Sequence, residues 1–218
     1  MERPLRQEEF HPGERRVGLD DRLDFACAGC GDCCTDTTAF LTPYDLWRLA
    51  RYLHLTTDEF LKKTELFLDG PDGPPLLQMA HDPATGRCIW LDEDHRCPIY
   101  PVRPLSCRTF PLGVRHTPEG DLITKAHTLP RCRGEGGGSQ TVRAYLEEVL
   151  APEDGEWSRA YAALNRLLFP PGERRARDRA YLAYCLLFLF DLDRLPGEHF
   201  AAKFAAAEAR LRRAAEIF

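Results

Sequence analysis

The chain has 218 residues and a formal net charge of −5 at neutral pH. Hydrophobic residues make up 44% and charged residues 29%, which is ordinary for a globular protein and excludes a disordered or fibrous class. Because the net charge is negative, we expect neither nucleic acid nor an anionic membrane surface as a partner. The first residues, "MERPLRQEEF", are too polar for a secretory signal, and the longest apolar run, residues 181–190, is too short to span a membrane. A cytoplasmic protein is therefore expected.

Nine cysteines are present. A reducing cytoplasm does not maintain structural disulfides, and an odd number of thiols also fits an all-disulfide framework poorly. Metal binding is therefore the favoured interpretation of this cysteine content.

After a lead-in over residues 1–20, two helix starts follow one another. Residues 41–55 begin with Thr42 as a cap, Pro43 at the first helical position and Asp45 in the first turn. Residues 56–68 begin with a capping-box pattern, and Phe60, Leu61 and Phe67 are expected to form the apolar face of this second helix.

From residue 70 to residue 135 the chain is rich in proline and glycine. Residues 76–80 and 87–91 are expected to form one β-hairpin and residues 113–127 a second. The prolines of residues 97–107 allow only a short helical turn there. The sequence "GEGGGS", residues 134–139, is predicted to be a linker.

Beyond residue 139 only helices are expected, three or four in number. Trp157, Tyr161 and Leu164 recur at helical spacing, and so do Phe200 and Phe204. Cys185 lies in an apolar helical stretch and is assigned to the core. The predicted fold class is α+β: a cysteine-rich, metal-stapled region with two helices and short β-hairpins, residues 22–133, followed by a helical C-terminal half, residues 139–218, packed on it.

The sequence "CAGCGDCC" places four thiols within residues 27–34. Cys27, Cys30 and Cys33 have the spacing with which ferredoxin-type loops hold three corners of an iron-sulfur cluster, and paired C-x-x-C knuckles also suit zinc. Gly29 and Gly31 permit the positive φ angles that such a knuckle requires. Successive side chains of an extended chain point to opposite sides, so the adjacent Cys34 is expected to face a different centre from Cys33.

Four more thiols follow in the loop-rich region. The candidate metal ligands are Cys27, Cys30, Cys33, Cys34, Cys88, Cys97, Cys107 and Cys132. Eight thiolates complete two tetrahedral sites, although one four-thiol centre with four spectators is the alternative. The negative charge of a thiolate centre could be offset by Arg103, Arg108, Arg131 and Arg133. The histidines near these cysteines, His81, His95 and His127, are interpreted as solvated loop residues.

The stretch "FACAGCGDCC", the helix start at residues 41–55 and "GRCIWLDEDHRCPIYPVRPLSCRTFPLG" together resemble the YkgJ-type cysteine-cluster proteins. The resemblance covers about residues 22–133 and implies a CxxCxxCC domain that chelates zinc or iron. It assigns the eight cysteines to that domain, with Tyr100, Arg103, Pro104, Arg108, Phe110 and Pro111 on the family's signature. The helical tail is not part of it.

Two functions remain open from the sequence. The first is a cytosolic metal-binding protein that holds an iron-sulfur cluster or zinc through the cysteine constellation, with no assigned activity. The alternative is a metal-dependent enzyme with a redox or Lewis-acid centre, distantly similar to the cluster of flagellin lysine methylases. In that case an open coordination position near Tyr100 and Arg103 is expected, and Arg108 belongs to the same cofactor-binding set.

Overall fold

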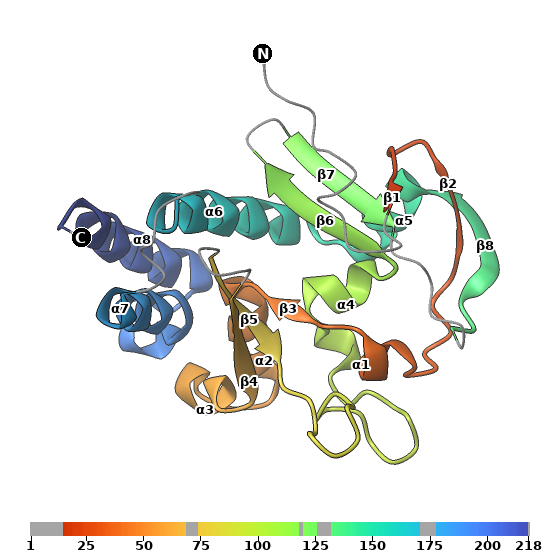
Figure 1. The fold of residues 1–218 in the computed structure, drawn as a ribbon, viewed down its shortest axis with the longest axis horizontal. Helices are drawn as coiled ribbons and strands as arrows, with labels where there is room; N and C mark the ends of the chain where they lie inside the picture. Colours follow the sequence, from red (N-terminus) through yellow and green to blue (C-terminus); the bar gives the residue numbers. More distant parts are fainter. Residues whose placement is uncertain (1–14, 69–73, 118–119, 126–131, 171–177, 218) are drawn as a thin grey trace.

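The computed structural model describes residues 15–68, 74–117, 120–125, 132–170 and 178–217, and the fold is mixed α+β, as predicted (Figure 1). The cysteine-rich half carries three short antiparallel sheets, and the C-terminal half is helical. In chain order the elements are β1 (Arg15–Arg16), β2 (Arg22–Phe25), α1 (Cys33–Asp36), β3 (Phe40–Leu41), α2 (Pro43–Tyr52), α3 (Thr57–Leu61), β4 (Thr64–Leu68), β5 (Pro75–Met79), the 3-10 turn η2 (Tyr100–Val102), α4 (Leu105–Thr109), β6 (Leu112–Thr117), β7 (Gly120–Lys125), β8 (Glu135–Thr141), α5 (Val142–Val149), α6 (Pro152–Leu168), α7 (Arg179–Phe190), the 3-10 turn η4 (Leu192–Arg194) and α8 (Phe200–Ile217).

Both predicted helix starts are confirmed. At the N-terminus of α2, the Thr42 hydroxyl accepts a hydrogen bond from the amide of Asp45, and the Asp45 carboxylate accepts one from the amide of Thr42. The same reciprocal box joins Thr56 and Glu59 at the start of α3. These caps use residues three apart in sequence, so they form without help from distant segments.

The second helix is shorter than predicted. It ends at Leu61, and Phe67 lies on strand β4, where it pairs with Leu76 of β5. Leu66, Phe67 and Phe40 of the adjoining β3 remain partly exposed. The assignment of Phe67 to a helical apolar face was therefore wrong: the segment takes up sheet pairing with β5 instead.

The predicted pairing of residues 76–80 with residues 87–91 in a first hairpin was also wrong. Strand β5 is the middle strand of the sheet β3-β5-β4, so both of its edges are already hydrogen-bonded. Residues 87–91 consequently make only an isolated bridge between Cys88 and His81. The second hairpin is confirmed, because β6 and β7 pair in register from Leu112 and Lys125 to the turn.

The glycine-rich stretch predicted to be a linker is strand β8, paired antiparallel with β2. Close packing restricts two of its glycines, Gly134 and Gly138. A Cβ atom at Gly138 would lie 2.7 Å from the carbonyl oxygen of Phe25, and one at Gly134 would lie 2.5 Å from that of Ala26. The composition that suggested a linker thus permits close approach of two backbones.

Two buried clusters support these elements. The larger cluster joins α2, α3, β5 and Ile99 to α6, α7 and α8, with Leu46, Leu168 and Phe190 fully buried. Cys185 is fully buried within it, as predicted. The smaller cluster, around Phe25 and Tyr145, lies between β2, β6, β7 and α5. In the part of the chain that the structure describes, no helix combines the length and apolarity needed to cross a membrane.

Candidate metal centre

The cysteine knuckle connects β2 to the one-turn helix α1. Gly29 and Gly31 adopt φ angles of 63° and 76°, as the motif predicted. Gly31 is also restricted by space, because a Cβ atom there would lie 3.0 Å from the carbonyl oxygen of His95. The Cys34 amide donates to the Gly31 carbonyl oxygen at 3.0 Å and closes the turn into α1. The glycines therefore set the path that brings four thiols to one side of the fold.

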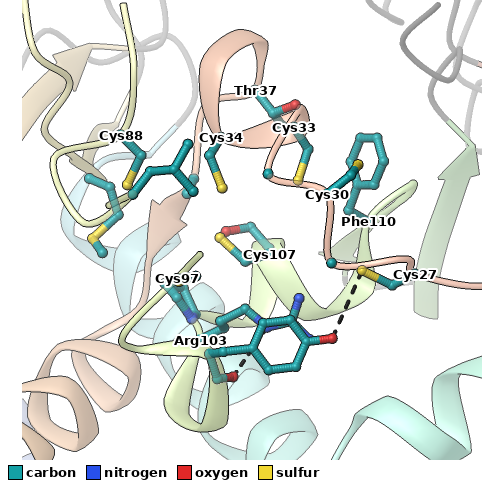
Figure 2. Close-up of a pocket in the computed structure, with 18 of the residues that line it drawn as sticks. Cys27, Cys30, Cys33, Cys34, Thr37, Cys88, Cys97, Arg103, Cys107 and Phe110 are labelled. Carbon is teal, nitrogen blue, oxygen red and sulfur yellow. Dashed lines mark hydrogen bonds between the residues drawn. The ribbon is translucent and has the colours of Figure 1, made fainter. Parts of the chain in front are cut away.

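All eight candidate cysteines line a single cavity of about 80 Å³. Figure 2 shows seven of them around a common space, with the sulfur atoms of Cys33, Cys34 and Cys107 directed into it. A single water molecule needs only about 10–15 Å³ of cavity volume, so the cavity has room for a group larger than one water. Its wall comes from both buried clusters, through Phe25 and Phe110 on one side and Met79 and Ile99 on the other.

The expectation that Cys33 and Cys34 face opposite sides rested on an extended chain and was wrong in that premise. Both residues lie in α1, where successive side chains are about 100° apart, and both line the same cavity. The Cys34 thiol donates a hydrogen bond to Cys33, which, with the positive charge of Arg103, lowers the pKa of Cys33 to about 7. The same hydrogen bond raises the pKa of Cys34.

Burial also raises the pKa of four further thiols of the cavity wall. It does so for Cys88, Cys97, Cys107 and Cys132, and neighbouring cysteines add to the effect as thiolates. The cysteines that act on Cys132 are Cys30, Cys33 and Cys27, whereas Cys107 is affected by Cys33, Cys88 and Cys97. Cys33 thus acts on both Cys132 and Cys107, while their other cysteine neighbours differ. Placing several thiolates together in this way requires a compensating positive charge, which a bound metal ion supplies.

Helix α4 brings Cys107 to the cavity. The buried carboxylate of Asp45 holds its first turn, because Oδ1 accepts a hydrogen bond from the Leu105 amide at 2.9 Å. Burial raises the pKa of Asp45, against three hydrogen bonds that lower it. A capping residue of α2 therefore also fixes the position of a cysteine-bearing helix.

Tyr100 and Arg103 both lie at the wall of the cavity that the thiols line. The Arg103 guanidinium stacks on the Tyr100 ring at 3.6 Å from its centroid, and the Tyr100 hydroxyl donates to the sulfur of Cys27 at 4.0 Å, drawn as a dashed line in Figure 2. Cys27 is exposed, and so is Tyr100. Cys27 and Tyr100 therefore mark the solvent-facing side of the cavity, and Arg103 gives this side one positive charge.

Arg108 is placed differently from Arg103. It does not line the cavity, and its guanidinium instead donates two hydrogen bonds to Asp154 on α6, at 2.6 and 2.7 Å. Arg133 is exposed and outside the lining, and Arg131 lies outside the described residues. Among the predicted basic residues that the structure describes, Arg103 alone lines the cavity.

The structure adds polar residues to this region that the sequence did not indicate. His81 and His95, interpreted from the sequence as solvated, are part of the cavity wall, while His127 lies outside the described residues. Asp154 was not singled out because it is 46 residues from its partner Arg108, and no local pattern links the two.

The donor set fits a thiophilic metal. Within the described ranges, no group of three or more His, Cys, Asp or Glu side chains has ligand geometry as the chain stands. Zinc and iron both bind thiolate sulfur, and the zinc–sulfur bond is about 2.3 Å long. Metal binding would therefore draw the thiols of the wall closer together. A wall of eight thiols with one guanidinium suits zinc or an iron-sulfur cluster and does not suit magnesium or calcium.

Comparison with known proteins agrees with this geometry. Residues 26–128 match the model of the family described as "CxxCxxCC: putative zinc- or iron-chelating domain", so the resemblance to a CxxCxxCC domain is confirmed for this part of the chain. The uncharacterized protein MJ0661 of Methanocaldococcus jannaschii is 39% identical over 94 residues, which are 43% of this chain and 47% of that protein. The chain thus spans about half of this curated relative. No solved structure matches the chain.

Proposed function

We propose that this chain is a metal-binding protein that holds zinc or an iron-sulfur cluster through the eight cysteines of the cavity wall. The observation that carries the proposal is that thiols from residues 27–34, 88, 97, 107 and 132, brought together from five parts of the chain, line one cavity. The ninth cysteine, Cys185, is buried in the helical core. This separation argues against a general excess of cysteine as the explanation.

The different neighbours of Cys132 and Cys107 suggest how the thiols would be shared. Cys27, Cys30, Cys33 and Cys132 would form one centre, because the first three are the cysteines that act on the last. Cys34, Cys88, Cys97 and Cys107 would form the other, because Cys88 acts on both Cys34 and Cys107, whereas Cys33 acts on thiols of both sets and would lie where the two centres meet. Each set contains four thiolates, which is the number that closes a structural zinc site or holds a four-iron cluster.

The first experiment is metal and acid-labile sulfide analysis, with an absorption spectrum, on protein purified without oxygen. We expect either about two zinc ions per chain without colour or a brown protein with matched iron and sulfide. Both results support metal binding, and they identify the metal. A protein that holds no stoichiometric metal, before or after anaerobic reconstitution with each metal, would overturn the proposal.

Single cysteine variants test the division into two centres. Cys132→Ser and Cys97→Ser should each lower the metal content by about half, since each removes one of four ligands from a different centre. Cys185→Ser is the matched control, because it removes a thiol that does not line the cavity, and its metal content should equal that of the unmodified chain. Loss of all metal from either cavity variant would argue for one shared centre.

A metal-dependent enzyme is the second candidate, favoured by the exposed side of the cavity. Cys27 and Tyr100 are exposed there, beside the charged side chain of Arg103. A centre that keeps an open coordination position would take up a small anion, whereas a closed four-thiolate centre would not. Addition of azide to cobalt-loaded protein distinguishes the two: a changed visible spectrum indicates an open position, and an unchanged spectrum indicates a closed, structural or electron-transferring centre.

A further inference from the structure

A buried carboxylate of the helical half is bonded to the helix that carries Cys107. Asp154, in the first turn of α6, is 3% exposed, and both of its oxygens accept hydrogen bonds from the guanidinium of Arg108. Its carboxylate also accepts bonds from the Ala151 amide at 2.8 Å and from Arg48 at 3.3 Å. A two-pronged arginine–carboxylate pair fixes orientation as well as distance.

Arg108 transmits this constraint to the cavity wall. It follows Cys107 directly on α4, and its Nε donates to the carbonyl oxygen of Arg103 at 3.0 Å. Arg103 lines the cavity and stacks on Tyr100. Asp154 itself does not line the cavity, and its two short bonds to Arg108 connect it to the helix that bears Cys107.

A second contact from the helical half holds the other end of α4. The hydroxyl of Tyr145, on α5, donates to the carbonyl oxygen of Phe110 at 2.6 Å and to that of Arg108 at 3.1 Å. Tyr145 is buried, with its ring packed at 90° against Phe25. Thus α4 is tied to α5 and α6 by independent contacts.

We infer that Asp154 and Tyr145 are positioning residues that make the helical half a clamp on Cys107, so that this half controls how fast metal leaves the cavity. The inference rests on the proposed metal binding. It gives a role to α5 and α6, which lie beyond the segment that matches the metal-chelating family. Groups that orient a ligand-bearing segment commonly change metal affinity when they are removed.

The test measures release of cobalt from the full-length protein to excess EDTA, followed by loss of its visible absorption. Asp154→Asn keeps the size of the side chain but removes the charge, and should release cobalt about 10-fold faster. Asp154→Glu restores the carboxylate and should recover part of the slow release. Tyr145→Phe removes only one hydroxyl and should also speed release. The thiolate-to-cobalt absorption band should shift in Asp154→Asn, which a general loss of stability would not cause.

Asp191→Asn is the matched control. Asp191 is an equally buried carboxylate of the helical half, 3% exposed, and it pairs with Arg194 and Thr57 rather than with α4. Its variant should release cobalt at the rate of the unmodified protein.

Release from Asp154→Asn and Tyr145→Phe no faster than from the control would overturn the clamp and leave the proposed metal binding intact. If Asp154→Asn fails to fold, Tyr145→Phe alone decides in the same way. If the unmodified protein takes up no cobalt, the proposed function fails, and the clamp fails with it.

Discussion

Gly134 lies directly against Ala26. The Gly134 carbonyl oxygen accepts a hydrogen bond from the Ala26 amide at 2.9 Å, and a Cβ atom at position 134 would lie only 2.5 Å from the Ala26 carbonyl oxygen. The contact joins the segment after Cys132 to the segment before Cys27, so it brings two distant parts of the cavity wall together. A single hydrogen atom in place of a side chain is what allows this approach.

Substitution of Gly134 by alanine should therefore destabilise the fold by about 1–3 kcal/mol, because the added methyl group overlaps a backbone atom that cannot move aside freely. Urea unfolding measures the change in free energy. Gly18→Ala is the control: its new Cβ atom would make only ordinary contacts, with the Asp21 side chain at 3.7 Å. Equal stability of the two variants would contradict the packing argument.

The two capping boxes make a second comparison, because only one of them reaches another helix. Asp45 is buried, and its carboxylate also accepts a hydrogen bond from the Leu105 amide. Asp45→Asn replaces one carboxylate oxygen with an NH₂ group, which faces an N–H donor and leaves a hydrogen bond unmade. We expect a loss of about 1–3 kcal/mol in the free energy of unfolding. Glu59→Gln changes the matching position of the exposed box on α3 and should have little effect. A loss from Glu59→Gln as large as that from Asp45→Asn would show that the contact with α4 adds nothing.

The Asp154–Arg108 pair makes stability depend on pH. Burial raises the pKa of the Asp154 carboxyl. The pKa is nevertheless lowered overall, by hydrogen bonds from Arg108 and Ala151 and by the positive charges of Arg108 and Arg48. A carboxylate with a lowered pKa stabilises the fold above the ordinary aspartate pKa of about 4, and this contribution is lost as the pH falls below it. The difference in free energy of unfolding between the unmodified chain and Asp154→Asn should thus be constant from pH 7 to about pH 5 and shrink in more acidic solution. Urea unfolding of both proteins across this range measures it; a difference that grows toward acid pH would contradict the assignment.

Features that depend on neighbours a few residues apart were predictable from the sequence. The cap at Thr42, the capping box at Thr56, the β6–β7 hairpin and the positive φ angles of Gly29 and Gly31 all agree with the structure. Each is decided by hydrogen bonds or dihedral preferences within one turn. The cysteine motif also limits which metals would suit the site, because thiol side chains favour thiophilic metals.

The tertiary structure alone decided the features that need two distant segments. Strand β5 pairs with β3 and β4 rather than with residues 87–91, and the glycine-rich β8 is a strand because β2 lies beside it. That all eight thiols share one cavity, and that Asp154 of the helical half is bonded to the helix bearing Cys107, follow from the same packing. The sequence determined local conformation and donor chemistry, whereas burial and backbone pairing between remote segments determined how these donors are brought together.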